Sequence, residues 1–186
     1  MEDEHHDYKI ITNLSAHVGK FDLIKDFDCG LEPMNKFYKT GLSRALKGGN
    51  YRGLGTINAS NQLVGFCTIS YAEVDKTQIQ VLTNETNLPR HLYCVRIVML
   101  GVDKNHQRKG ISSDMMMVAF EQAANVNSQI PVKGICLDSA PNSVSYYEKL
   151  GFEKLDEADE NGSTPMFLRI TRILDALATI EEEENV

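Results

Sequence analysis

A nearly continuous apolar run, LYCVRIVMLGVD at residues 92–103, limits the possible folds of this chain more than any other feature. Its many branched residues are typical of a strand that is covered on both faces, so we expect it in the middle of a sheet. The segment HQRKGISSDMMMVAF follows at residues 106–120. Apolar residues then recur on one helical face: Ile111, Met115, Val118, Ala119 and Ala123. The pattern predicts a buried strand, a turn and an amphipathic helix that ends near Asn127.

The turn before that helix is suited to binding phosphate. A helix that starts near Gly110 presents backbone N–H groups without an intrahelical partner, at the positive end of the helix dipole. Such an end attracts anions. Gly110 lets a ligand approach the backbone, and Arg108 and Lys109 add positive charge beside it. The pattern QxxGxx alone is more often that of an ordinary surface loop before a core helix.

The rest of the chain predicts further strands and helices. Alternating or apolar runs predict strands at residues 8–12, 51–59, 62–74, 132–138 and 165–170. Helical spacing predicts an arm at residues 31–47 and a short helix within residues 141–152. Residues 75–91 are polar and contain Pro89, which predicts a connecting loop. Residues 171–186 read as a helical or frayed acidic extension, after a single domain at residues 1–170.

Charge and composition exclude few partners. The net charge of −7 comes from acidic runs at Glu2–Glu4, Asp156–Glu160 and Glu181–Glu184, and the rest of the chain carries 15 acids and 19 bases. Nucleic acid and phosphorylated cofactors therefore remain compatible. The start of the chain has no signal-peptide pattern and no apolar run is long enough to span a bilayer, so we expect a cytoplasmic protein without membrane contact.

The four cysteines are widely spaced. Cys29, Cys67, Cys94 and Cys136 form no CxxC pair, so we expect reduced, mostly buried thiols rather than a disulfide framework. For the same reason we expect no metal site.

Two linked motifs resemble the GNAT acetyltransferase superfamily. They are VRIVMLGVDKNHQRKGIS, which matches a strand followed by Q/R-x-x-G-x-G/A and a helix, and SYYEKLGF, which matches a later Y-x-x-x-G-F segment. The resemblance implies an α/β (α+β) GNAT fold, in which a central mixed, twisted sheet of six or seven strands is flanked by helices. The sheet would be splayed between its fourth and fifth strands, here residues 92–102 and 132–138. The third small residue of the loop is Ser112 rather than glycine or alanine.

The resemblance assigns the cofactor acetyl-CoA to the central strand and the turn. Backbone N–H groups from Gln107 to Ser112 would hold the pyrophosphate of coenzyme A, and the backbone of Met99 to Val102 would bind its pantetheine arm. The cofactor-binding residues implied are Met99, Leu100, Gly101, Val102, Gln107, Arg108, Lys109, Gly110, Ile111 and Ser112.

Tyr147 occupies the family position of the catalytic acid. A phenol with an ordinary pKa of about 10 is protonated at neutral pH, as a donor to a departing thiolate must be. Tyr146 is its neighbour, and the spacing to Gly151 and Phe152 selects Tyr147. A buried aromatic residue that only packs is the alternative for Tyr147. No general base is evident, because residues 92–102 contain no Asp, Glu or His; His106 would have to act through water.

Within the superfamily, FDCG at residues 27–30 and QLVGFCTIS resemble the branch of bacterial tRNA-acetylating toxins. This resemblance implies an N-acetyltransferase that acetylates the α-amino group of aminoacyl-tRNA, a ribbon-helix-helix antitoxin and a homodimer, to which Arg172–Ile180 contribute. Met99 stands where the family often has a strand arginine. Two alternatives remain open: an acetyltransferase for a small amine or a protein N-terminus, and a coenzyme A-binding accessory protein without turnover.

Overall fold

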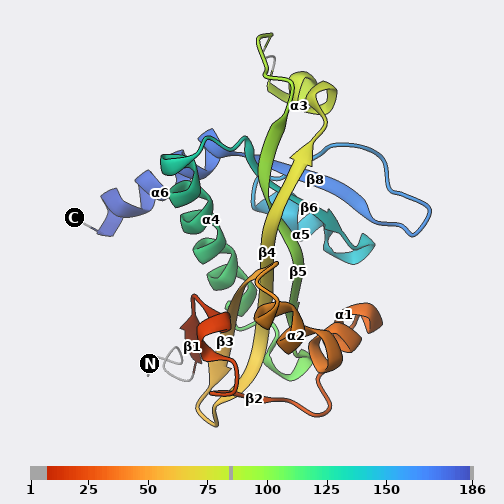
Figure 1. Cartoon of the computed structure of the whole chain (residues 1–186), viewed down its shortest axis with the longest axis vertical. Helices are drawn as coiled ribbons and strands as arrows, with labels where there is room; N and C mark the ends of the chain where they lie inside the picture. Colours follow the sequence, from red (N-terminus) through yellow and green to blue (C-terminus); the bar gives the residue numbers. More distant parts are fainter. Residues whose placement is uncertain (1–7, 84–85, 185–186) are drawn as a thin grey trace. The chain divides into compact units, whose positions relative to one another are not determined.

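The computed structural model of the chain describes residues 8–83 and 86–184. They divide into two compact units. Figure 1 shows the helices and strands of the chain. The N-terminal unit contains the described residues up to Ser70 together with Val98–Ala119, and the C-terminal unit contains Tyr71–Ile97 together with the residues from Phe120 onward. The acidic residues Glu2, Asp3 and Glu4 lie outside the described residues.

The strands form one mixed sheet with the order β1-β3-β4-β5-β6-β8-β7, and β2 pairs with β4. Their bounds are β1 Tyr8–Ile11, β2 Asp22–Leu23, β3 Arg52–Asn58, β4 Gln62–Val74, β5 Leu92–Val102, β6 Gly134–Ser139, β7 Glu153–Lys154 and β8 Thr164–Arg169. The predicted α/β class and central strand are confirmed, since β5 lies between β4 and β6. The count of eight exceeds the predicted six or seven because β2 and β7 have only two residues each.

The helices are α1 Glu32–Lys36, α2 Leu42–Lys47, α3 Lys76–Thr83, α4 Ile111–Gln129, α5 Val144–Lys149 and α6 Ile170–Glu184. A π-helical turn, η3 Phe37–Gly41, joins α1 to α2, so these three elements form the predicted arm. Short 3-10 turns are η2 Leu14–His17, η4 Lys104–His106 and η5 Pro141–Ser143. In the part of the chain that the structure describes, no helix is long and apolar enough to cross a membrane.

The arm is anchored to the core of the N-terminal unit by Tyr38. Its ring is fully buried and stacks on Phe27 with 3.7 Å between the ring centroids. Its hydroxyl donates to the carbonyl of Leu63 at 2.5 Å and accepts from the backbone N–H of Ile24 at 3.0 Å. The hydroxyl therefore connects the arm both to β4 and to the segment around Ile24, which precedes the arm in the chain.

The prediction of a loop at residues 75–91 is wrong in its first half, where α3 forms. Asp75 caps this helix, because its carboxylate accepts from the backbone N–H of Thr77 at 2.7 Å. Ile79 is fully buried in the core of the C-terminal unit, against Leu92 and Phe167 among others. A cap and one buried anchor thus form a helix in a segment whose other residues are largely polar.

The expectation of four reduced thiols is also wrong. Cys94 on β5 and Cys136 on β6 form a disulfide, with their Cα atoms 6.2 Å apart. This separation lies in the ordinary range for disulfides and follows from the pairing of the two strands. Cys29 and Cys67 are free, and burial raises the pKa of both thiols, that of Cys67 to about 12.

Pairing between β5 and β6 is parallel and short. Among the described residues it comprises Val95 with Ile135, Arg96 with Cys136 and Ile97 with Leu137. The second half of β5, Val98–Val102, has no β6 partner in this register. Such a limited ladder agrees with the splay that the resemblance implies at this pair of strands.

Candidate functional site

The turn after β5 is shaped by Asp103, which is only 1% exposed. Its backbone N–H donates to Val64 of β4 at 2.9 Å, and its carboxylate accepts from the backbone N–H of Asn105 at 3.0 Å. The carbonyl of Asp103 accepts from the backbone N–H of His106 at 2.8 Å. These bonds form η4 directly at the end of the central strand.

Two residues with left-handed backbone follow. Arg108 has φ +61° and Gly110 has φ +80°, and α4 begins at the next residue, Ile111. Left-handed backbone is costly for a residue with a side chain, about 1–2 kcal/mol, and such residues are concentrated at functional sites. Turns of this kind direct successive N–H groups into one concavity that binds anions.

Space beside Gly110 is open. A Cβ built at this residue would meet only the Asp114 carboxylate oxygens, at 3.9 and 4.0 Å. The turn thus offers unobstructed backbone at the start of a helix of 19 residues. This arrangement fits the diphosphate of a nucleotide cofactor.

The side chain of Gln107 points back into the protein. Its amide donates to the carbonyl of Val102 at 2.9 Å and to that of Cys29 at 3.3 Å. Lys109 lies 5.6 Å from the centre of the Tyr8 ring, and the Tyr8 hydroxyl is 2.9 Å from Nδ1 of His106. The side chain of Gln107 therefore stabilises the turn. Only its backbone N–H is left for the predicted binding of the cofactor diphosphate.

The predicted pantetheine-binding residues form the end of β5. Met99 and Leu100 are half-buried, whereas Gly101 and Val102 are buried. Gly101 packs closely, because a Cβ there would meet the Phe66 ring at 3.0 Å and the Cys29 sulfur at 3.4 Å. All ten predicted cofactor-binding residues thus lie in one continuous segment of the N-terminal unit.

Tyr147 lies in the C-terminal unit, at the end of α5. The backbone N–H of Phe152 donates to the Tyr147 carbonyl at 3.0 Å, and that of Gly151 donates to Glu148 at 3.0 Å. Gly151 has φ +89°. This is a Schellman motif, which requires the glycine and brings the residue after it against the last turn of the helix.

The same motif fixes the Tyr147 ring. Tyr147 is 8% exposed, and its ring meets that of Phe152 edge to face with 5.5 Å between the centroids. The spacing Y-x-x-x-G-F is therefore the spacing of a helix end. Tyr146 packs against Tyr147 at 5.1 Å, and its own hydroxyl is buried without a hydrogen-bond partner among the described residues.

Sequence reasoning missed a polar pair on β5 and β6. Arg96 donates to the Asp138 carboxylate at 2.6 Å, directly beside Ile97 and Leu137, the last pair of the parallel ladder. Both side chains are about half exposed. The two residues lie 42 positions apart. Only the register of the strands, which the sequence does not reveal, brings them together.

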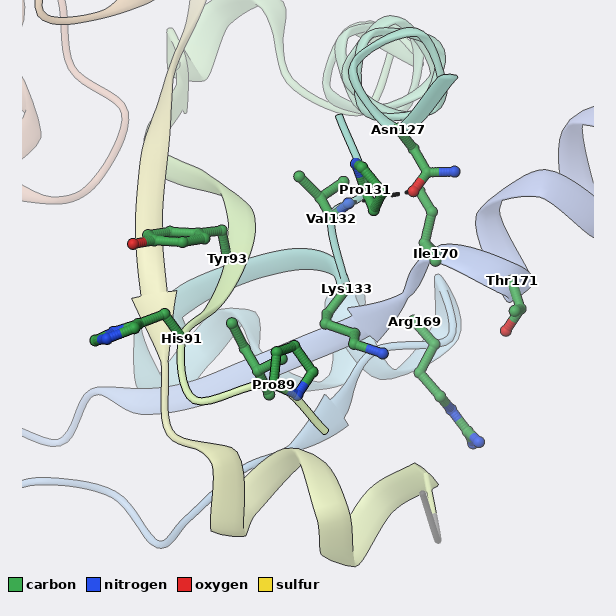
Figure 2. A pocket seen from close by; sticks show the side chains of 11 residues that line it. Pro89, His91, Tyr93, Asn127, Pro131, Val132, Lys133, Arg169, Ile170 and Thr171 are labelled. Carbon is green, nitrogen blue, oxygen red and sulfur yellow. Dashed lines mark hydrogen bonds between the residues drawn. The ribbon is translucent and has the colours of Figure 1, made fainter. Parts of the chain in front are cut away.

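The C-terminal unit also contains a cavity of about 560 Å³ (Figure 2). Its lining residues are Pro89, His91, Leu92, Tyr93, Asn127, Pro131, Val132, Lys133, Arg169, Ile170 and Thr171. His91 already contacts Glu73 at 2.6 Å, and Arg169 contacts Glu153 at 2.7 Å. In Figure 2, Lys133 and Arg169 point to one side, whereas His91 and Tyr93 point to the other. The charged groups do not converge, so we assign no ligand to this cavity.

Comparison with known proteins finds proteins that are similar to most of the chain. The family model described as acetyltransferase (GNAT) domain matches residues 54–167. No curated protein matches the chain. Among solved structures, that of a bacterial toxin has a TM-score of 0.79 at 31% identity, covering 83% of this chain and 87% of the toxin chain.

Two further structures share the fold at lower identity. A tyrosine-to-phenylalanine mutant of the toxin KacT has a TM-score of 0.75 at 23% identity and covers 92% of this chain and 99% of its own. A structure of the toxin AtaT has a TM-score of 0.77 at 19% identity, with the same coverage of 92% and 99%.

Proposed function

The chain belongs to the acetyltransferase (GNAT) domain family, and on that premise we propose that it acetylates the α-amino group of an aminoacyl-tRNA. An acetyl-CoA-dependent N-acetyltransferase needs a site for the cofactor, a proton donor and a site for the acceptor.

The turn after β5 fits the cofactor. The backbone from Gln107 to Ser112 would hold the diphosphate, because Arg108 and Gly110 adopt the left-handed conformation and no side chain fills the space at Gly110. The side chains of Arg108 and Lys109 add positive charge. The backbone of Met99–Val102, which has no β6 partner in the parallel ladder, would bind the pantetheine arm as an additional strand. When bound, acetyl-CoA supplies the acetyl thioester that the amine attacks.

Tyr147 is the proposed proton donor for the leaving thiolate. Its ring is held by the helix end and by Phe152, so its orientation is fixed before any substrate binds. A phenol is protonated at neutral pH and can donate at its Oη atom. Tyr146, whose buried hydroxyl has no partner in the described part of the chain, has no such role in this proposal.

The observation that carries the acceptor proposal is the charge of the arm. Lys36, Lys39, Arg44 and Lys47 are all exposed, whereas Glu32 is the only acid between residues 31 and 47. Exposed cations on one helical arm are suited to the phosphate backbone of RNA. The arm is also fixed to the protein core through Tyr38, so these charges are presented on a rigid element.

Similar structures support the same acceptor. The AtaT structure is that of the toxin complexed with acetyl-methionyl-tRNAfMet, and another shows AtaTR bound with acetyl-CoA. The lack of Asp, Glu and His on β5 also fits, because an α-amino group has a pKa of about 8 and is partly neutral without a base. An AtaT mutant has been solved with the C-terminus of the antitoxin AtaR, which supports an antitoxin partner for this chain. We propose a cytoplasmic homodimer as its working form.

The decisive experiment incubates purified protein and labelled acetyl-CoA separately with charged tRNA, uncharged tRNA, free lysine and polyamines. We expect label only on charged tRNA, and loss of kcat by about 100-fold or more in Tyr147→Phe, which is typical of a removed general acid. Acetyl-CoA affinity should stay within about twofold of wild type.

Tyr146→Phe is the matched control, and it should retain full activity. Faster acetylation of lysine or polyamines than of charged tRNA would contradict the acceptor. Loss of activity in Tyr146→Phe with retention in Tyr147→Phe would reverse the roles of the two tyrosines. Growth arrest on expression of wild type, absent in Tyr147→Phe, is the corresponding result in cells.

A further inference from the structure

The turn that follows β5 is fastened to a segment 75 residues earlier in the chain, FDCG at residues 27–30. The buried carboxylate of Asp103 accepts from the backbone N–H of Asp28 at 3.0 Å. In return, the backbone N–H of Lys104 donates to the carbonyl of Asp28 at 2.8 Å, and its ammonium lies 2.9 Å from the Asp28 carboxylate. Three polar contacts thus join two loops that are distant in sequence.

The FDCG segment is itself fixed to the arm by Asn35, which is only 7% exposed. The Asn35 amide donates to the Asp28 carboxylate at 2.9 Å, and its oxygen accepts from the backbone N–H of Cys29 at 2.8 Å. The Cys29 carbonyl in turn accepts from the Gln107 side chain. One network therefore runs from α1 through FDCG to the predicted diphosphate turn, entirely within the N-terminal unit.

We propose that Asp28 and Asp103 are positioning residues that hold the turn at residues 104–112 in its cofactor-binding shape. With Asn35 and Lys104 they form a set of four residues that we call the loop clamp. The inference rests on the proposed function only in taking acetyl-CoA as the cofactor. It does not depend on the identity of the acceptor.

Chemistry explains why both positions need carboxylates. Every partner of Asp103 is a donor: one oxygen accepts from Asp28, and the other accepts from the backbone and side-chain amides of Asn105. An asparagine at 103 would have to place its NH2 group against one of these donors. Asp28 likewise receives only donors, from Lys104, Gly30 and Asn35, and these bonds hold the pKa of its carboxyl well below its usual range.

The experiment compares Asp103→Asn and Asp28→Asn with Asp26→Asn. Asp26 is the matched control, because it is a neighbouring acid whose side chain is exposed. For Asp103→Asn we expect Kd and KM for acetyl-CoA to rise about tenfold with kcat within about twofold, since a buried group loses its partner. The more exposed Asp28→Asn should raise Kd roughly threefold.

A second measurement separates a positioning role from general destabilisation. Amide hydrogen exchange at residues 104–112, measured without any cofactor, should be faster in both variants, whereas exchange in β6 and β8 should match wild type. Asp26→Asn should change neither exchange nor affinity. If Asp103→Asn does not fold, Asp28→Asn carries the test alone, because its carboxylate lies near the surface.

Wild-type affinity and exchange in both variants would overturn the inference, as would a fall in kcat at constant KM. A wild-type protein that fails to bind acetyl-CoA would contradict the proposed function instead. In that case faster exchange in the two variants would still support the loop clamp, and unchanged exchange would still refute it.

Discussion

Gly110 is the residue of the predicted cofactor site at which we expect a substitution to weaken cofactor binding most. In Gly110→Ala the backbone must either keep φ near +80°, at a cost of about 1–2 kcal/mol, or change the shape of the turn. The new methyl would also occupy the open space in which we place the diphosphate. We expect Kd for acetyl-CoA to rise about tenfold or more by isothermal titration calorimetry. Gly19→Ala is the control, since Gly19 has a similar φ of +86° and a Cβ built there would meet no atom within 4 Å. Gly19→Ala should lose a similar amount of stability, while its affinity for acetyl-CoA stays unchanged. An equal loss of affinity in Gly19→Ala would refute the explanation that the methyl group added at Gly110 blocks the diphosphate.

Sequence patterns pointed to some residues of the candidate site and not to others, for a physical reason. Gln107–Ser112 and Tyr147 lie in local motifs whose geometry depends on neighbours in the chain, such as the helix end at Gly151. Asp28 and Asp103 are joined by a contact across 75 residues, and Arg96 and Asp138 by one across 42. No local pattern encodes such pairs, although FDCG already marked the first of these segments.

At the scale of elements, the arm depends on the Tyr38 hydroxyl. Tyr38→Phe leaves the Ile24 N–H and the Leu63 carbonyl without this partner, so we expect a loss of about 1–3 kcal/mol at neutral pH. Burial raises the pKa of Tyr38 to about 12. Between pH 10 and 12 the unfolded phenol ionises while the folded one stays protonated, so this stabilisation is complete below pH 10 and is lost as pH rises.

Urea unfolding of both proteins at several pH values tests this. The difference in free energy of unfolding between wild type and Tyr38→Phe should shrink above pH 10. A constant difference up to pH 12 would show that the phenol has an ordinary pKa. The other tyrosines contribute equally to both proteins and cancel in the comparison.

Elements with a strong apolar period were predicted well, and those fixed by single contacts were not. The strand at residues 92–102 and the helix from Ile111 agree with β5 and α4. In contrast, α3 depends on the Asp75 cap and on Ile79, which a mostly polar segment does not reveal. The Cys94–Cys136 bond likewise depends on strand register, which the spacing of cysteines in the sequence does not predict.

At the scale of the whole molecule, net charge and local charge have opposite signs. The chain carries −7 in total, while its arm is basic. Replacing Lys36, Lys39, Arg44 and Lys47 by glutamine should weaken tRNA binding. It should also reduce the slope of log K against log salt concentration by up to roughly 3, since each phosphate contact on a single strand contributes about 0.7. Filter binding from 50 to 300 mM salt measures this slope. An unchanged slope in the arm variant would refute the basic arm as the RNA contact.

The side-chain amide of Gln107 donates to the carbonyls of Val102 and Cys29, within the protein itself. A turn that these internal hydrogen bonds already hold in its cofactor-binding shape needs no slow rearrangement before the cofactor binds. In stopped-flow mixing, nucleotide capture should follow a single exponential whose rate rises linearly with ligand concentration and never reaches a plateau.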